Sequence, residues 1–167
     1  MPLAVSGLSN TVAMTAGAQH SCALSADGTE KCWGFNRYGQ LGDLTTTDSS
    51  TPVAVSGVTS ASVIATGSYH SCALLANGTT KCWGDNVLGQ LGLGTTSGPH
   101  VCSGSGCNPT PTLVPGVANA AALAEGYYHS CALSANGTAK CWGNGTSGQL
   151  GNNSTSSAST PVTVLGL

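Results

Sequence analysis

Charged side chains are scarce in this sequence. Of its 167 residues, only four are lysine or arginine and six are aspartate or glutamate. Proteins that bind nucleic acid use clustered basic side chains to displace counterions from phosphates. The basic residues here are scattered: Lys31, Arg37, Lys81 and Lys140. We therefore expect no nucleic-acid partner, and the same shortage argues against an electrostatic hold on anionic membranes.

Long apolar runs and helical periods are missing as well. No stretch is long enough to cross a bilayer, so we expect no membrane insertion. No segment combines a helical period with capping residues. No signal peptide precedes the first repeat, and we interpret Met1 as the start of a trimmed or processed segment.

The chain is instead one unit repeated three times. Equivalent histidines, tryptophans and prolines are separated by 50 and then 59 residues: His20, His70 and His129; Trp33, Trp83 and Trp142; Pro2, Pro52 and Pro111. We take 1–167 as a single repeat domain with units 2–51, 52–110 and 111–160, and a remnant at 161–167. The second unit carries nine extra residues near 97–109. Each unit contains about four short strands, which is the number in one propeller blade.

A turn in each unit predicts a hairpin. Ala26-Asp27-Gly28 has counterparts at 76–78 and 135–137, and Asp-Gly or Asn-Gly suits a three-residue loop with glycine in the left-handed position. Folding the chain about residue 27 sets Cys22 opposite Cys32, within disulfide reach. The same symmetry applies to the other two units. We expect four local disulfides: Cys22 with Cys32, Cys72 with Cys82, Cys131 with Cys141, and Cys102 with Cys107.

Paired cysteines in a weakly charged chain indicate an oxidising compartment, so we expect an extracellular or cell-surface location. Zinc is the competing interpretation of the cysteines and histidines. Structural zinc sites favour two to four residues between paired cysteines, whereas nine intervene within each hairpin. No Cys-x-x-Cys redox motif occurs. We expect no metal, no cofactor and no catalytic residues.

The repeated histidine and tryptophan have two interpretations. Each could be a ligand-binding or catalytic group, but a residue copied in every unit is better explained as part of the blade's own hydrogen bonding and packing. The insertion is the feature that the repeat explains least. Its His100, Val101 and Asn108 are our candidate binding residues, because binding sites often lie on loops held by a rigid scaffold. The alternative is a tolerated surface insertion.

The units resemble the regulator-of-chromosome-condensation repeat family. The resemblance rests on Gly-x-x-His-Ser-x-Ala-Leu (17–24, 67–74 and 126–133) and on Trp-Gly-x-Asn-x-x-Gly-Gln-Leu-Gly (33–42 and 83–92). It implies a propeller, usually of seven blades, without implying one activity. The founding member is a nucleotide exchange factor for a small nuclear GTPase, and other members are protein-binding modules. This chain departs from the pattern in having three copies, the insertion, and a displaced asparagine at Asn144.

The predicted fold is therefore all-β: three four-stranded propeller blades plus a terminal strand remnant, a partial propeller completed by self-association. For function, we expect a non-catalytic, secreted or cell-surface module that binds a protein or a glycan, as in adhesion. The alternative is a structural unit that assembles with itself into a ring or an extracellular filament. Nucleotide exchange on a small GTPase is a weaker third hypothesis, because disulfides are out of place in a nuclear factor.

Overall fold

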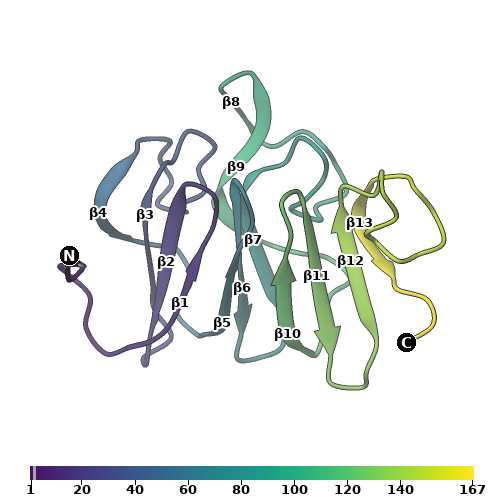
Figure 1. The fold of residues 1–167 in the computed structure, drawn as a ribbon, viewed down its shortest axis with the longest axis horizontal. Coiled ribbons are helices and arrows are strands. Elements are labelled where there is room, and N and C mark those ends of the chain that lie inside the picture. Colours follow the sequence, from purple (N-terminus) through teal and green to yellow (C-terminus); the bar gives the residue numbers. More distant parts are fainter. Residues whose placement is uncertain (2) are drawn as a thin grey trace.

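A computed structural model describes residue 1 and residues 3–167; Pro2, the expected start of the first unit, lies outside the described residues. The described chain contains strands and no helix, and therefore no helix that could cross a membrane. The strands form three antiparallel sheets that stand side by side like blades (Figure 1). The prediction of an all-β, blade-type fold is thus confirmed, and the three sheets do not close into a ring.

The first sheet has four strands in chain order: β1 (Thr11–Ala16), β2 (His20–Ser25), β3 (Glu30–Gly34) and β4 (Ser49–Ala54). The second has five: β5 (Ala61–Thr66), β6 (His70–Leu75), β7 (Thr80–Asp85), β9 (Ser105–Leu113) and, at its edge, β8 (His100–Cys102). The third again has four: β10 (Ala120–Glu125), β11 (His129–Ser134), β12 (Ala139–Gly143) and β13 (Ala158–Thr163).

The hairpin between β2 and β3 has the predicted register. Cys22 pairs directly with Cys32, and their Cα atoms lie 4.1 Å apart. Gly28 has a φ of 78°, the left-handed value that this loop requires. The turn is also held by Asp27, whose carboxylate accepts hydrogen bonds from the amide and hydroxyl of Thr29. The hairpins of the other two sheets repeat this register, and all four expected cysteine pairs lie at disulfide distance.

The sheets are offset from the sequence period. The segment that begins at Pro52 does not start the second sheet: β4 contains Pro52 and pairs with β3 as the outer strand of the first sheet. Likewise, Pro161 lies in β13 and completes the third sheet, where the period suggests the start of a fourth copy. A repeat pattern is unchanged when its origin is shifted, so periodicity cannot locate the break between sheets.

The apolar core lies between the sheets rather than within one. Each sheet presents two different faces to its neighbours. Its trailing face carries the two cysteines and two leucines, and in the first sheet these are Cys22, Cys32, Leu24 and Leu41. The leading face of the next sheet carries Ala61, Ile64, Ala73 and Trp83 and packs against them. The same two sets of positions meet between the second and third sheets.

The three sheets are also joined by hydrogen bonds. The indole of Trp83 and the hydroxyl of Ser71 both donate to the carbonyl of Gln40 in the preceding sheet, at 3.0 and 2.9 Å. Since Ser71 uses its proton in this way, it accepts from Nε2 of His20 at 2.8 Å. His20 and His70 are therefore residues that connect one blade to the next. Gly67 is required beside His70, because a Cβ at Gly67 would contact the imidazole ring.

Candidate functional site

The phenylalanine, the four tyrosines, the single arginine and the buried Glu125 all lie at one end of the sheets. This loop end carries the β1–β2, β5–β6 and β10–β11 connections and the longer β3–β4, β7–β9 and β12–β13 connections (Figure 1). Backbone hydrogen bonds tie the short and long connections together: Phe35 donates to Gln19, Asp85 to Tyr69, and Asn144 to Tyr128. The opposite end carries the tight hairpin turns.

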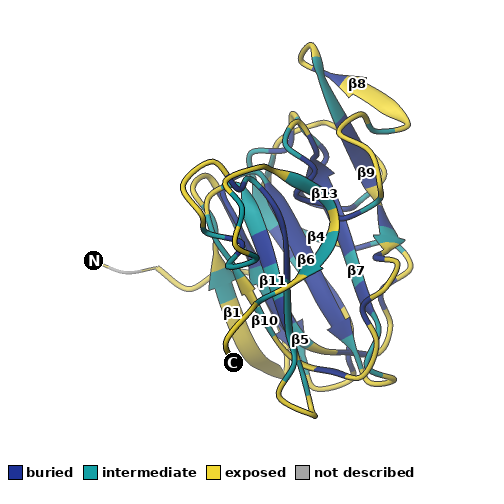
Figure 2. Cartoon of the chain, turned by 90° about the vertical axis from the view of Figure 1, so that its right-hand side faces the viewer, coloured by how far each residue is buried: buried dark blue, intermediate teal, exposed yellow. Residues whose placement is uncertain are grey.

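The insertion forms a second hairpin at the loop end. Strands β8 and β9 are joined by Ser103 and Gly104, which both have positive φ, as a two-residue turn of this kind requires. The disulfide between Cys102 and Cys107 joins its two strands. The hairpin projects beyond the blades, and most of its tip is exposed (Figure 2). Because β9 continues into the second sheet, the projection has a firm base.

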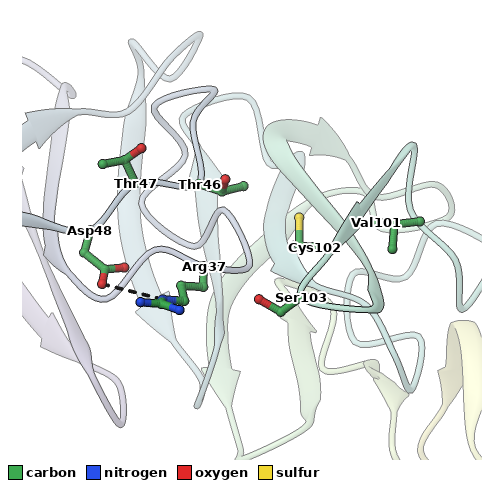
Figure 3. Close-up of a pocket in the computed structure, with 7 residues that line it drawn as sticks. All are labelled: Arg37, Thr46, Thr47, Asp48, Val101, Cys102 and Ser103. Atoms are coloured by element: carbon green, nitrogen blue, oxygen red, sulfur yellow. Dashed lines mark ion pairs between the residues drawn. The ribbon is translucent and has the colours of Figure 1, made fainter.

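A cleft of about 520 Å³ separates this hairpin from the β3–β4 connection of the first sheet. One wall is formed by Arg37, Thr46, Thr47 and Asp48, and the other by Val101, Cys102 and Ser103 (Figure 3). Arg37, the single arginine of the chain, lies 3.9 Å from the carboxylate of Asp48, and both side chains are largely exposed. An exposed pair of this kind adds little stability, so both groups remain free to bind a ligand.

Of the three candidate residues in the insertion, Val101 lines the cleft and is strongly exposed. His100 is exposed, pairs through its backbone with Cys107, and is not among the lining residues. Asn108 is buried in β9, where its amide donates to Thr112 and its carbonyl oxygen accepts from the Thr110 amide. The structure thus brings one candidate to the cleft and gives Asn108 a role inside the strand.

The buried side chain of Asn36 shapes the wall opposite the hairpin. Its amide nitrogen lies within 3.3 Å of oxygen atoms of Asp43, Thr45 and Thr47, and its oxygen accepts from the amide of Leu41. Asn86 holds the corresponding loop of the second sheet in the same way. In the third sheet Gly145 occupies this position, because a Cβ there would meet the carbonyl of Ser156.

We expect Asn36→Ala to lower the free energy of unfolding by about 2–3 kcal/mol, since several buried polar groups lose their partner. Asn144→Ala is the matched control, because Asn144 is only half-buried and bonds locally to Thr146; its expected cost is below about 1 kcal/mol. Chemical denaturation measures both. Equal losses for the two variants would contradict the role given to Asn36.

An aromatic cluster lies at the same end of the sheets, and its Tyr38 follows Arg37 directly in the chain. It contains the one phenylalanine and all four tyrosines of the chain: Phe35, Tyr38, Tyr69, Tyr127 and Tyr128. The rings of Tyr38 and Tyr69 lie 5.3 Å apart, and those of Tyr127 and Tyr128 lie 4.5 Å apart. Burial raises the pKa of Tyr69, and the neighbouring Tyr127 and Tyr38 add to this effect. The amide of Ser68, next to Tyr69, donates a backbone hydrogen bond to the carbonyl of Tyr127, which brings the two ring groups close together.

The sequence interpretation missed this cluster and the Arg37–Asp48 wall. A usable signal was present, because each of these tyrosines lies either just before a repeat histidine or inside the Trp-Gly-x-Asn-x-x-Gly segment. Equivalent repeat positions come to the same end of a propeller, so the repeat alignment by itself is sufficient to group the tyrosines at one end.

Glu125 is a third feature of the loop end. Its side chain is buried and accepts a hydrogen bond from His70 at 2.9 Å. The corresponding residues of the other sheets, Ala16 and Thr66, carry no charge. His70 also contacts Ser130, so it connects the second and third sheets as His20 connects the first and second. These contacts hold the blades together, and the His70 side chain is fully buried between them.

Comparison with known proteins agrees with this fold. The family model described as "Regulator of chromosome condensation (RCC1) repeat" matches residues 32–74 and 78–133. A second family model of the same repeat matches residues 11–40, 62–90 and 121–149. No match is found among curated proteins.

Solved structures share the arrangement of blades. Prp20p from Saccharomyces cerevisiae, described with its binding properties to Gsp1p and histones, is 25% identical; its TM-score is 0.82, over 96% of this chain and 39% of that one. Human WBSCR16 is 24% identical with a TM-score of 0.76, over 94% and 40%. The ectodomain of the Physcomitrella patens receptor kinase CR4 is 25% identical with a TM-score of 0.52, over 87% and 33%.

This chain therefore spans about two fifths of the length of Prp20p and of WBSCR16, and about one third of the length of the CR4 ectodomain. The family match covers more than half of its residues and includes the histidine, tryptophan and glycine positions that join the blades. The chain belongs to the regulator of chromosome condensation (RCC1) repeat family.

Proposed function

We propose that this chain is a non-catalytic module that binds an extracellular protein or glycan at its loop end. The observation that carries the proposal is that all four tyrosines, the phenylalanine and the single arginine gather there. Tyrosine and arginine, together with tryptophan, are enriched in binding hot spots.

The chemistry of the cleft suits a polar ligand. Arg37 supplies several fixed donors, Asp48 supplies acceptors, and the hydroxyls of Thr46, Thr47 and Ser103 can do both. Tyr127 is 60% exposed, so its ring is available for stacking on a sugar or an apolar side chain. The scarcity of charge elsewhere on the chain leaves this end as its most distinctive surface.

An extracellular location is part of the proposal. Its support is the four disulfides, which persist in oxidising compartments, together with the likeness to a plant receptor ectodomain. The same disulfides argue against nucleotide exchange in a nucleus. Binding to Gsp1p and to histones is described for Prp20p, and this chain lacks the clusters of charge that would suit a histone.

The test is a binding screen of the purified chain against printed glycans and a panel of purified extracellular proteins. We expect at least one specific probe, and we expect Arg37→Ala and Tyr127→Ala each to weaken its binding about tenfold or more. Asp27→Asn is the control, because it lies at the opposite end and copies the turn residue of the other two hairpins. Equal binding by all variants, or no probe bound, would contradict the proposal.

A further inference from the structure

A pocket lies where the first connections of the three sheets converge. The β1–β2, β5–β6 and β10–β11 connections are equivalent in the repeat, and β5 contacts both β1 and β10. Residues 16–18, 66–68 and 125–127 line a pocket of about 300 Å³ between these connections. A Cβ at Gly17 would collide with the carbonyl of Gly67, and a Cβ at Gly67 with the carbonyl of Gly126. The three glycines therefore let the connections pack into one continuous wall.

Two buried oxygen atoms at this pocket have no hydrogen-bond partner among the described residues. They are Oε1 of Glu125, whose side chain is 1% exposed, and Oγ of Ser68, a residue that is 3% exposed. Both residues line the pocket. Buried polar atoms of folded proteins are almost always paired with protein, water or a ligand. The two free oxygens therefore indicate a bound group that donates hydrogen bonds.

The negative charge of Glu125 is not balanced by its histidine partner. Oε2 of Glu125 accepts a hydrogen bond from Nε2 of His70, whereas Nδ1 of the same ring has no partner among the described residues. An imidazolium would bury a second N–H without an acceptor, so these contacts assign the neutral ring with its proton on Nε2. His70 thus orients the carboxylate and leaves its charge in place. A buried carboxylate is costly unless a cation pairs with it.

The chain's own lysine and arginine side chains lie elsewhere. The three lysines donate to backbone carbonyls at the opposite end, beside the hairpin turns: Lys31 to Gly7, Lys81 to Gly57 and Lys140 to Gly116. Arg37 lies beside Asp48 in the cleft. Four of the six acidic residues, by contrast, are at the loop end: Asp43, Asp48, Asp85 and Glu125. They are spread over the three sheets, so they attract cations to this end without forming one continuous acidic surface.

We infer that this pocket binds the ammonium group of a lysine side chain from a protein partner. The inference rests on the proposed function, because it names one group that the loop end recognises. An ammonium group has a positive charge and three hydrogen-bond donors, which match the free oxygens of Glu125 and Ser68. Tyr127 also lines the pocket, and the face of its ring attracts cations.

The pocket suits lysine better than an amino sugar or a metal ion. Ala16 and Ala18 give it small apolar walls, which fit the methylene stem of a lysine. The hydroxyls of a sugar would find few partners, because the hydroxyl of Thr66 is already bonded to Thr15. Calcium takes about six to eight oxygen ligands. Glu125 supplies the single carboxylate among the described residues that line the pocket.

The experiment is a titration of the intact, oxidised chain with Nα-acetyl-lysine methylamide, followed by NMR or calorimetry. For a probe of this size we expect a Kd of about 1 mM. The analogue acetylated at Nε keeps the stem and loses the charge, so it should bind about tenfold more weakly or not at all.

Glu125→Gln should weaken binding of the lysine probe about tenfold or more, because the amide oxygen still accepts from His70 but the charge is lost. Asp27→Asn is the matched control: it removes the same charge at the opposite end, and it should bind as the wild type does. Ala18→Leu fills the pocket without touching Glu125 and should block the probe to a similar extent. Ala18 is exposed, so the fold should survive, and circular dichroism verifies this for each variant.

Binding that is unchanged in Glu125→Gln, or tighter binding of glucosamine or of Ca²⁺ than of the lysine probe, would overturn the inference. The screen against glycans and extracellular proteins fails or succeeds separately. A partner whose binding depends on Arg37 but not on Glu125 would support the proposed function and contradict the lysine pocket. Binding of the lysine probe with no partner found in the screen would do the reverse.

Discussion

Replacing Trp83 by alanine is expected to lower the free energy of unfolding by about 4–5 kcal/mol. The indole is fully buried between the first two sheets and donates a hydrogen bond to the carbonyl of Gln40. Truncating a buried tryptophan costs about 3–5 kcal/mol, and the carbonyl loses a partner in addition. Urea denaturation followed by circular dichroism measures this loss.

The repeat supplies the control for this prediction. Trp33 occupies the same position in the first sheet, is only partly buried, and packs against no other sheet within the described residues. We expect Trp33→Ala to cost about 1 kcal/mol. Similar losses at the two positions would mean that the interface between sheets does not set the stability of the fold.

Removing the carboxylate of Glu30 is expected to stabilise the protein at alkaline pH. Glu30 is 2% exposed, lies between the first two sheets, and has one carboxylate oxygen without a hydrogen-bond partner. Burial raises its pKa from 4.5 to about 8. The folded state therefore holds a proton that the unfolded state has already released, and stability is lost as pH rises from 4.5 to 8.

Glu30→Thr copies the residue found at the same position in the second sheet, Thr80, which is also buried. Relative to the wild type, we expect its stability gain to be small below pH 4.5 and to grow to roughly 5 kcal/mol above pH 8, because each pKa unit corresponds to about 1.4 kcal/mol. Thermal denaturation across this pH range measures the difference. A gain independent of pH would show that shape, not ionisation, is responsible.

His20 affects how the stability of the fold depends on pH on the acidic side. Burial, with a smaller contribution from His70, lowers the pKa of His20 from 6.5 to about 4. The unfolded state binds a proton first, so this contribution is lost as pH falls from 6.5 to 4. Between pH 4.5 and 6.5 the effects of His20 and Glu30 have opposite signs. The wild type should therefore be most stable in that interval, whereas Glu30→Thr should remain stable at higher pH.

Local features of the sequence were sufficient for the hairpins and the cysteine pairs. The Asp-Gly and Asn-Gly turns fix the register of the strands beside them, and a fixed register decides which cysteines face each other. The nine extra residues expected near 97–109 overlap β8 and the first part of β9. These features depend on contacts between residues about ten apart, so local sequence contains the necessary information.

The break between sheets and the binding surface could not be obtained in this way. Whether Pro52 begins one sheet or ends another depends on which strand it pairs with. The wall formed by Arg37 and Asp48 faces Val101 only because two adjacent blades bring their loops together. Asn108, an expected binding residue, is instead buried in β9 by its pairing with β7.

By itself, the sequence determined a repeated β unit, its turns and its disulfides, because each depends on the residue types within one period. Only the tertiary structure decided which faces are covered. Leu24 and Leu133 have the same neighbours in sequence, yet Leu24 is buried by the next blade and Leu133 is 44% exposed. A side chain on the face of a sheet is buried only when another sheet packs against that face. A periodic sequence repeats the same residue types in every sheet, so it does not show which faces are covered.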